Sequence, residues 1–200
     1  MTKIDSATER KALIIHATIE CIAQYGYTNF SMQDVAKVAG VSKGIIHYYF
    51  MNKEELMMSV LNRVSSDIEQ LLSNLLETIK NPEQCLRSVL HLCFGVVRKK
   101  REYYCINMDF WTQINQKEKV RQSIAQHYEK FRSVTAHVIQ LGIDKQVFKV
   151  DNAKLAASVI IALIDGIALQ WLFDETVFVY EDMVKKCEEI ILEHLLGVKS

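Results

Sequence analysis

The scarcity of chain-breaking residues is the feature of this sequence that most constrains its fold. The chain of 200 residues contains one proline and seven glycines. So few chain breakers favour long helices over many short strands joined by turns. Apolar residues make up 50% of the sequence and charged residues 24%, which is the composition of a globular protein. We therefore expect an all-α globular protein.

Apolar periodicity and capping residues divide the chain into about nine helices. Gly26, Gly40, Gly142 and Gly197 each follow an apolar run, where helix C-termini favour glycine. The short segment 147–150 has strand-forming residues but is too short to build a sheet. The expected helices cover residues 8–25, 31–39, 42–50, 53–80, 82–98, 102–114, 118–141, 152–173 and 180–196.

Residues 31–50 have the spacing of a helix-turn-helix motif. Ser31 and Asp34 match a capping box at the start of the first short helix. That helix ends at Gly40, and Ser42 caps the second short helix after a tight turn. Such a pair of helices is typical of proteins that read the major groove of DNA. A plain three-helix core with a solvated outer face is the alternative.

The second short helix has one side that suits a DNA groove. Lys43 and His47 are four residues apart on that side, as are Gly44 and Tyr48. They supply a cation, two aromatic donors and a glycine that lets another backbone approach closely. The N-terminal amides of this helix and the Ser42 hydroxyl are suited to phosphate.

Residues 8–68 closely resemble the DNA-binding domain of the tetracycline-repressor (TetR) family. The matching residues are Gly26-Tyr27, Phe30-Ser31-Met32, Asp34-Val35-Ala36, Ala39-Gly40-Val41-Ser42-Lys43-Gly44, Tyr49-Phe50 and Lys53-Glu54-Glu55-Leu56. The helical remainder, which includes residues 166–171, resembles the effector and dimer domain of that family more weakly. His47 departs from the family, which usually has tyrosine there, so whether it contacts a base, a phosphate or neither stays open.

The resemblance implies a homodimeric repressor that a small molecule releases from a palindromic operator in double-stranded DNA. Residues 1–55 would form the helix-turn-helix DNA-binding domain, and residues 56–200 the effector-binding and dimerisation domain. Most DNA contacts would go to phosphates. The residues implied to face DNA are Ser42, Lys43, Gly44, His47, Tyr48, Tyr49 and Lys53. A constitutive DNA-binding module, or an activator without a small-molecule effector, is the alternative.

The expected effector pocket lies among the fourth to eighth helices. Aromatic walls with polar tips are typical of ligand pockets, although each of these residues could equally be an ordinary core residue. Asp165 stands in an apolar run, and a buried carboxylate needs a partner or a raised pKa. The candidate effector residues are Tyr103, Tyr104, Asn107, Phe110, Trp111, Tyr128, Asp165 and Trp171.

The eighth helix is the candidate dimer interface. It is apolar nearly all round, so more than one of its sides must be buried. Ala162 and Gly166 are small residues four positions apart, which allows another helix to approach closely. The alternative is a central core helix within one subunit. A membrane span is not expected, because the apolar stretch contains Asp165, and a mid-bilayer aspartate costs about 2.5–3.5 kcal/mol.

Charge and motif content exclude several other classes of protein. The 24 basic and 24 acidic residues balance, so any nucleic-acid site must be local. Five scattered cysteines form no C-x-x-C pair, which predicts a reduced, cytoplasmic protein without a metal site or cofactor. A helical enzyme is a remote alternative, because the chain has no G-x-S-x-G motif, metal-spaced triad or glycine-rich phosphate loop.

Overall fold

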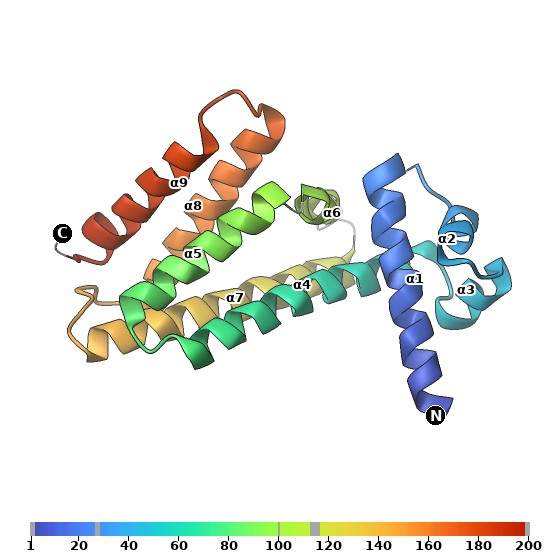
Figure 1. The fold of residues 1–200 in the computed structure, drawn as a ribbon, viewed down its shortest axis with the longest axis horizontal. Helices are drawn as coiled ribbons and strands as arrows, with labels where there is room; N and C mark the ends of the chain where they lie inside the picture. The colour runs from blue at the N-terminus through green and yellow to red at the C-terminus, as the bar shows by residue number, and fades with distance from the viewer. Residues whose placement is uncertain (1–2, 27–28, 100, 113–116, 199–200) are drawn as a thin grey trace. The chain divides into compact units, whose positions relative to one another are not determined.

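The computed structural model describes residues 3–26, 29–99, 101–112 and 117–198, and every regular element in this part of the chain is a helix (Figure 1). This confirms the all-α prediction. The helices are α1 (Lys3–Tyr25), α2 (Met32–Ala39), α3 (Lys43–Tyr49), α4 (Lys53–Thr78), α5 (Pro82–Lys99), α6 (Arg101–Trp111), α7 (Glu118–Asp144), α8 (Ala153–Phe173) and α9 (Tyr180–Glu189), followed by a π-helical turn, η1 (Ile190–Leu195).

The helices form two compact units. The first contains α1 to α3, the part of α4 up to Asp67, α6 and the start of α7. The second contains the rest of α4 from Ile68, α5, the rest of α7 from Ile124, α8 and α9. Helix α4 therefore contributes to both units as one continuous helix. The functional boundary predicted at residues 55 and 56 stays a prediction.

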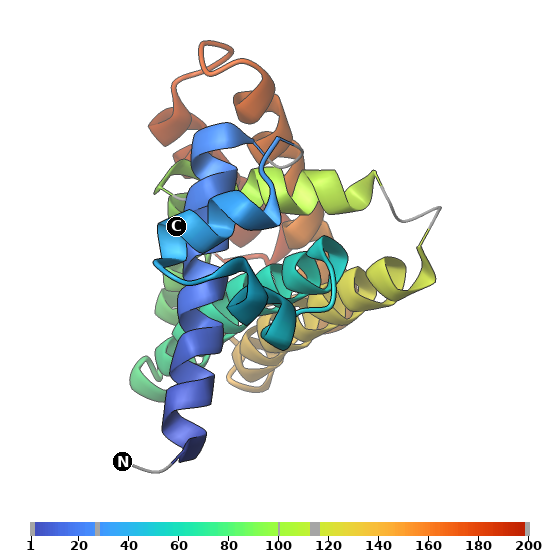
Figure 2. The ribbon, with the colours of Figure 1, turned by 90° about the vertical axis from the view of Figure 1, so that its right-hand side faces the viewer.

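The first unit contains the predicted helix-turn-helix motif, in which α2 packs against both α1 and α3 (Figure 2). Both bonds of the capping box form, because the Asp34 N–H donates to Ser31 Oγ and the Ser31 N–H donates to Asp34 Oδ2. Gly40 ends α2 with a left-handed φ of 64°. The Ile45 N–H then donates to Ser42 Oγ at 3.3 Å, which starts α3. Local capping thus fixes both short helices and the turn between them.

The second unit is built around α5, α8 and α9, which lie side by side (Figure 1). Leu86 of α5, Ile160 of α8 and Ile191 of η1 are fully buried in its core. Side-chain caps again set the helix starts. Asn81 accepts a hydrogen bond from the backbone of the α5 first turn, and Asn152 does the same for α8.

One predicted helix end is wrong. Gly142 does not end its helix, because α7 continues to Asp144. It serves close packing instead, since a Cβ at this position would lie 2.0 Å from Cδ2 of Phe148. The left-handed residue after α7 is Gln146, with a φ of 58°. The last helix is α-helical only to Glu189, after which it widens into the η1 turn.

Replacing Gly142 with alanine is expected to destabilise the protein by about 1–3 kcal/mol, because the added methyl group must displace the buried Phe148 ring. Urea unfolding measures this change. Gly95→Ala in α5 is the matched control, since nothing lies within 4 Å of its added Cβ. Equal stability of the two variants would contradict the packing role of Gly142.

Candidate functional site

The outer face of α3 is open, as the sequence predicts. Lys43, His47 and Tyr48 are exposed there, and Tyr48 shows 82% of its side-chain surface. On the opposite face, Ile46 is fully buried and Ile45 is half-buried. The helix is therefore anchored from one side and free to contact a partner from the other.

Gly44 lies on this open face at the first turn of α3. A Cβ added to it would approach only Ser42 Oγ, at an ordinary contact distance of 3.7 Å. The fold of the single chain therefore does not require glycine at this position. A glycine that the fold does not need, on an exposed helix start, is suited to close approach by another molecule.

Tyr49 and Lys53 differ from the other residues of the predicted DNA face. Tyr49 is half-buried, and its ring contacts that of Tyr48 edge to face with centroids 5.1 Å apart. Lys53 Nζ donates a hydrogen bond of 2.7 Å to the carbonyl oxygen of Phe30. Burial of this ammonium lowers the pKa of Lys53. The predicted contact of Lys53 with a DNA phosphate stays a prediction.

An acid–tyrosine pair joins two helices of the second unit. The Tyr128 hydroxyl of α7 donates to Asp165 Oδ2 of α8 at 2.7 Å. Burial and the Asp165 charge raise the pKa of Tyr128, so the phenol stays protonated as a donor. The pKa of the Cys93 thiol on α5 is raised to about 12, mainly by burial and to a smaller extent by the same Asp165 charge. The Asp165 side chain thus lies between α7 and α5, where it accepts the hydrogen bond of Tyr128 and acts on the thiol of Cys93.

Two further aromatic rings lie in the same unit. The Trp171 ring of α8 lies 4.9 Å from that of Tyr180 at the start of α9. The Tyr180 hydroxyl donates to the carbonyl oxygen of Phe94 at 2.8 Å. Sequence reasoning missed Tyr180, because its partners are far away in the chain and nothing local marks it. We call Cys93, Tyr128, Asp165, Trp171 and Tyr180 the acid–aromatic cluster.

The other five predicted effector residues all lie on α6, in the first unit. Phe110 is a core residue with 1% exposure, whereas Tyr104 and Trp111 are half-buried. Asn107 donates to the carbonyl oxygen of Tyr103 at 3.0 Å, a bond within the helix. Tyr103 also lines a hollow of about 410 Å³ together with residues of α1 and α4. The assignment of α6 to the effector pocket stays a prediction.

Helix α8 carries an exposed apolar stripe at helical spacing. We call Leu155, Val159, Ala162, Gly166 and Phe173 the α8 stripe; all are exposed except Gly166, which is half-buried. Leu155 is 63% exposed and Phe173 is 75% exposed. Nothing lies within 4 Å of a Cβ added to Gly166. An exposed stripe of this length indicates an interaction surface.

The same helix is long and apolar enough to span a membrane by length and composition alone. Within the structure, 44% of its apolar window is buried. Its other face includes the buried residues Ile160, Ile164 and Ala168. The helix therefore combines a core face with the exposed α8 stripe.

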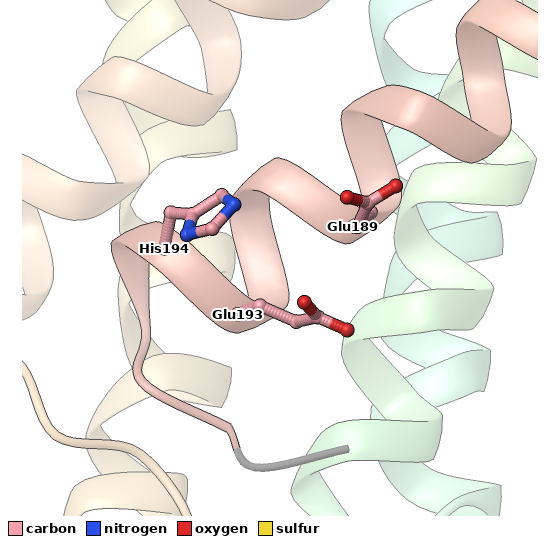
Figure 3. Close-up of side chains that lie close together, drawn as sticks. All are labelled: Glu189, Glu193 and His194. Atoms are coloured by element: carbon pink, nitrogen blue, oxygen red, sulfur yellow. The ribbon is translucent and has the colours of Figure 1, made fainter.

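Glu189, Glu193 and His194 form a small cluster at the end of α9 and in η1 (Figure 3). Their potential ligand atoms lie within 4.8 Å of one another. All three residues are exposed, and Glu189 is already paired with Lys186. Exposed acidic groups with a lysine partner are common on protein surfaces, so this cluster alone does not indicate a metal site.

The basic run at residues 98–101 is partly engaged within the second unit. Arg98 pairs with Glu181, and Arg101 pairs with Glu175. Lys100 of this run, like Tyr27 of the family resemblance, lies outside the residues that the structure describes. The two arginines therefore tie the chain at the end of α5 to the segment around the α8–α9 connection, within the second unit.

Comparison with known protein families matches both parts of the chain. Residues 14–60 match the family described as bacterial regulatory proteins, tetR family. Residues 82–196 match the family described as BetI-type transcriptional repressor, C-terminal. The second match alone covers more than half of the chain.

Among curated relatives, the HTH-type transcriptional regulator BetI of Agrobacterium fabrum is 24% identical over 170 residues, covering 85% of this chain and 80% of BetI. BetI of Pseudomonas aeruginosa PAO1 is 26% identical over 175 residues, covering 85% of each chain.

Among solved structures, a transcriptional regulator from Saccharomonospora viridis in complex with choline has a TM-score of 0.85 and 25% identity. The match covers 94% of this chain and 98% of that one. FadR from Bacillus subtilis in complex with stearoyl-CoA has a TM-score of 0.73 and 21% identity, covering 94% and 99%. This second similarity shows the fold alone.

Proposed function

We propose that the chain, which belongs to the tetR family of bacterial regulatory proteins, is a homodimeric repressor. A quaternary ammonium compound, such as choline, would release it from operator DNA. A ligand-responsive, DNA-binding transcriptional repressor is the function that this family membership carries. The proposal goes further in two respects: it assigns the surface that binds DNA, and it names the chemical class of the effector. Its proposed location is the cytoplasm, where the operator DNA lies.

The open face of α3 is the proposed DNA-reading surface. Lys43, Gly44, His47 and Tyr48 are all exposed there, and Ser42 at the helix start is exposed as well. A helix of this kind fits the major groove, with its N-terminal residues toward the bases. In a dimer, the two copies of α3 would read half-sites about 34–36 Å apart, or a multiple of that spacing.

The acid–aromatic cluster is the observation that carries the proposed class of effector. A quaternary ammonium cannot donate hydrogen bonds, so proteins recognise it with aromatic faces and negative charge. Asp165 supplies the charge, and Trp171 and Tyr180 supply adjacent rings in the same unit. Choline is bound by the similar regulator from Saccharomonospora viridis. A polyanionic acyl-CoA is less suited, because residues 151–200 carry nine acidic and four basic side chains.

Operator binding with and without effector tests the proposal. Fluorescence anisotropy on DNA from the region upstream of the protein's own gene should show salt-dependent binding that choline weakens about 5- to 150-fold. Stearoyl-CoA is the matched control ligand and should leave the affinity unchanged. Absence of DNA binding would contradict the repressor function, whereas release by stearoyl-CoA instead of choline would contradict the effector class.

Replacing Gly44 with alanine should weaken operator binding about 10- to 100-fold, because the added methyl group blocks close approach of the α3 backbone to DNA. The fold should be unaffected, since the methyl group meets no close neighbour within the chain. Anisotropy measures binding, and circular dichroism during heating measures folding. Gly95→Ala is the control, and a Gly44→Ala variant with unchanged operator affinity would rule out a close approach at this point.

A further inference from the structure

Arg101 joins the C-terminal end of α8 to the connection that follows this helix. Its Nη2 donates to the carbonyl oxygen of Leu172, in the last turn of α8, at 3.3 Å. Its Nη1 pairs with the carboxylate of Glu175, in the connection between α8 and α9. The last carbonyl groups of a helix have no partner within the helix, and a positive charge near them is favourable. One guanidinium group thus holds both the helix end and the chain beyond it.

The connection held in this way leads from one ring of the acid–aromatic cluster to the other. Trp171 directly precedes Leu172, and Tyr180 begins α9 after the connection. The centroids of the two rings are 4.9 Å apart. The Tyr180 side chain is also fixed to α5, because its hydroxyl donates to the carbonyl oxygen of Phe94. The placement of the Trp171 ring depends on the last turn of α8, which Arg101 holds.

The end of a helix needs such a contact more than its middle does. The last turn opens most readily, because fewer backbone hydrogen bonds hold it. The connection after α8 has its own local order, since Asp174 Oδ1 accepts from the N–H and the hydroxyl of Thr176 at 2.9 and 2.6 Å. Those bonds stabilise the turn but do not join it to another part of the unit. Arg101 makes that link, and both of its partners belong to the second unit, as it does.

We infer that Arg101 is a positioning residue of the proposed effector site, because it keeps the Trp171 ring beside Tyr180 to receive a quaternary ammonium group. The inference rests on the proposed function, which supplies the class of effector and the cluster that binds it. Arg101 does not contact the effector in this arrangement, since a guanidinium group repels a cation. It acts through the backbone of Leu172, the residue next to Trp171.

The charge of Arg101 allows the direction of the effect to test the inference. Arg101→Met removes a positive charge, so Coulomb repulsion alone predicts tighter binding of choline. Loss of positioning predicts weaker binding, by roughly 2- to 30-fold, because a displaced ring loses its cation–π attraction. Isothermal titration calorimetry with choline on the DNA-free protein measures the affinity. Tighter or unchanged binding would overturn the inference.

Arg98→Met is the matched control. Arg98 pairs with Glu181 as Arg101 pairs with Glu175, and the two arginines show 55% and 50% of their side-chain surface. Its loss removes the same charge but not the bond to the end of α8, so choline binding should not weaken. Equal weakening in both variants would contradict the inference, since any lost ion pair near the connection would then have the same effect. Circular dichroism during heating checks that both variants fold.

Arg101→Lys separates the charge of the side chain from its shape. Lysine keeps the positive charge but replaces the forked guanidinium group with a single ammonium group, which cannot reproduce both contacts in the same geometry. Its choline affinity should lie between those of the parental protein and Arg101→Met. Choline binding by Arg101→Lys that is weaker than binding by Arg101→Met would show that the charge opposes the effector and that the contacts do not position the ring.

Operator binding distinguishes a failure of this inference from a failure of the proposed function. Without choline, Arg101→Met should bind the operator within a few-fold of the parental affinity. Saturating choline should still release it, because positioning changes the affinity for the effector and not its maximal effect. If the parental protein binds no choline, the proposed effector class fails and the inference fails with it. If the parental protein binds choline and Arg101→Met binds it equally well, only the inference fails.

Discussion

Gly166→Leu is expected to convert the proposed dimer into a monomer at micromolar concentration. Within one chain, a side chain at this position meets open space, so the fold should tolerate leucine. In a two-fold interface built on the α8 stripe, the new side chain occurs twice and blocks the close approach of the helices. Overpacking of this kind costs about 1–3 kcal/mol at each site.

Operator binding should fall with the loss of the dimer. A monomer contacts one half-site at a time and loses the avidity gained from linked sites, which is about 10²- to 10⁴-fold. Analytical ultracentrifugation measures the oligomeric state, and anisotropy measures operator affinity. Gly95→Leu is the matched control, because Gly95 is another helical glycine with open space around it but lies on α5. A Gly166→Leu variant that remains dimeric would move the interface away from this part of α8.

Local signals predicted much of the fold, because helix starts and ends depend on residues close in sequence. The capping box of Ser31 and Asp34 and the left-handed Gly40 are both present as expected. The start of α4 has a related arrangement. The Glu55 N–H donates to Asn52 Oδ1, and the Glu55 carboxylate accepts from the Met51 N–H, one residue before the cap.

Sequence reasoning missed the contacts that a residue makes with a distant partner. Gly142 is explained by the ring of Phe148, which no helix-end rule considers. Lys53 reaches Phe30 across 23 residues, and Tyr180 reaches Phe94 across 86 residues. A sequence pattern shows that a lysine or tyrosine is present but does not show which carbonyl group or ring it meets. The face of α3 was easier to predict, because helical spacing alone separates Ile46 from Lys43 and His47.

Asp165→Asn is expected to abolish most of the response to choline while leaving operator affinity within a few-fold of the parental value. Asparagine keeps the size of the side chain and can still accept the hydrogen bond of Tyr128. It removes the negative charge that would attract a cation. Bound choline would cover the half-buried carboxylate, and removing one partner of such a covered charge pair costs about 2 kcal/mol or more, which corresponds to at least about a tenfold weaker effector affinity.

An operator titration by anisotropy at increasing choline concentration measures this response. Asp182→Asn on the exposed first turn of α9 is the matched control, because it removes the same charge from the surface of the same unit. Its choline response should equal that of the parental protein. This result would show that the total charge of the unit does not cause the lost response of Asp165→Asn. An unchanged choline response in Asp165→Asn would remove Asp165 from the effector site. Loss of operator binding without choline would instead identify the Asp165–Tyr128 bond as a structural contact, because the half-buried carboxylate would then serve the fold rather than the effector.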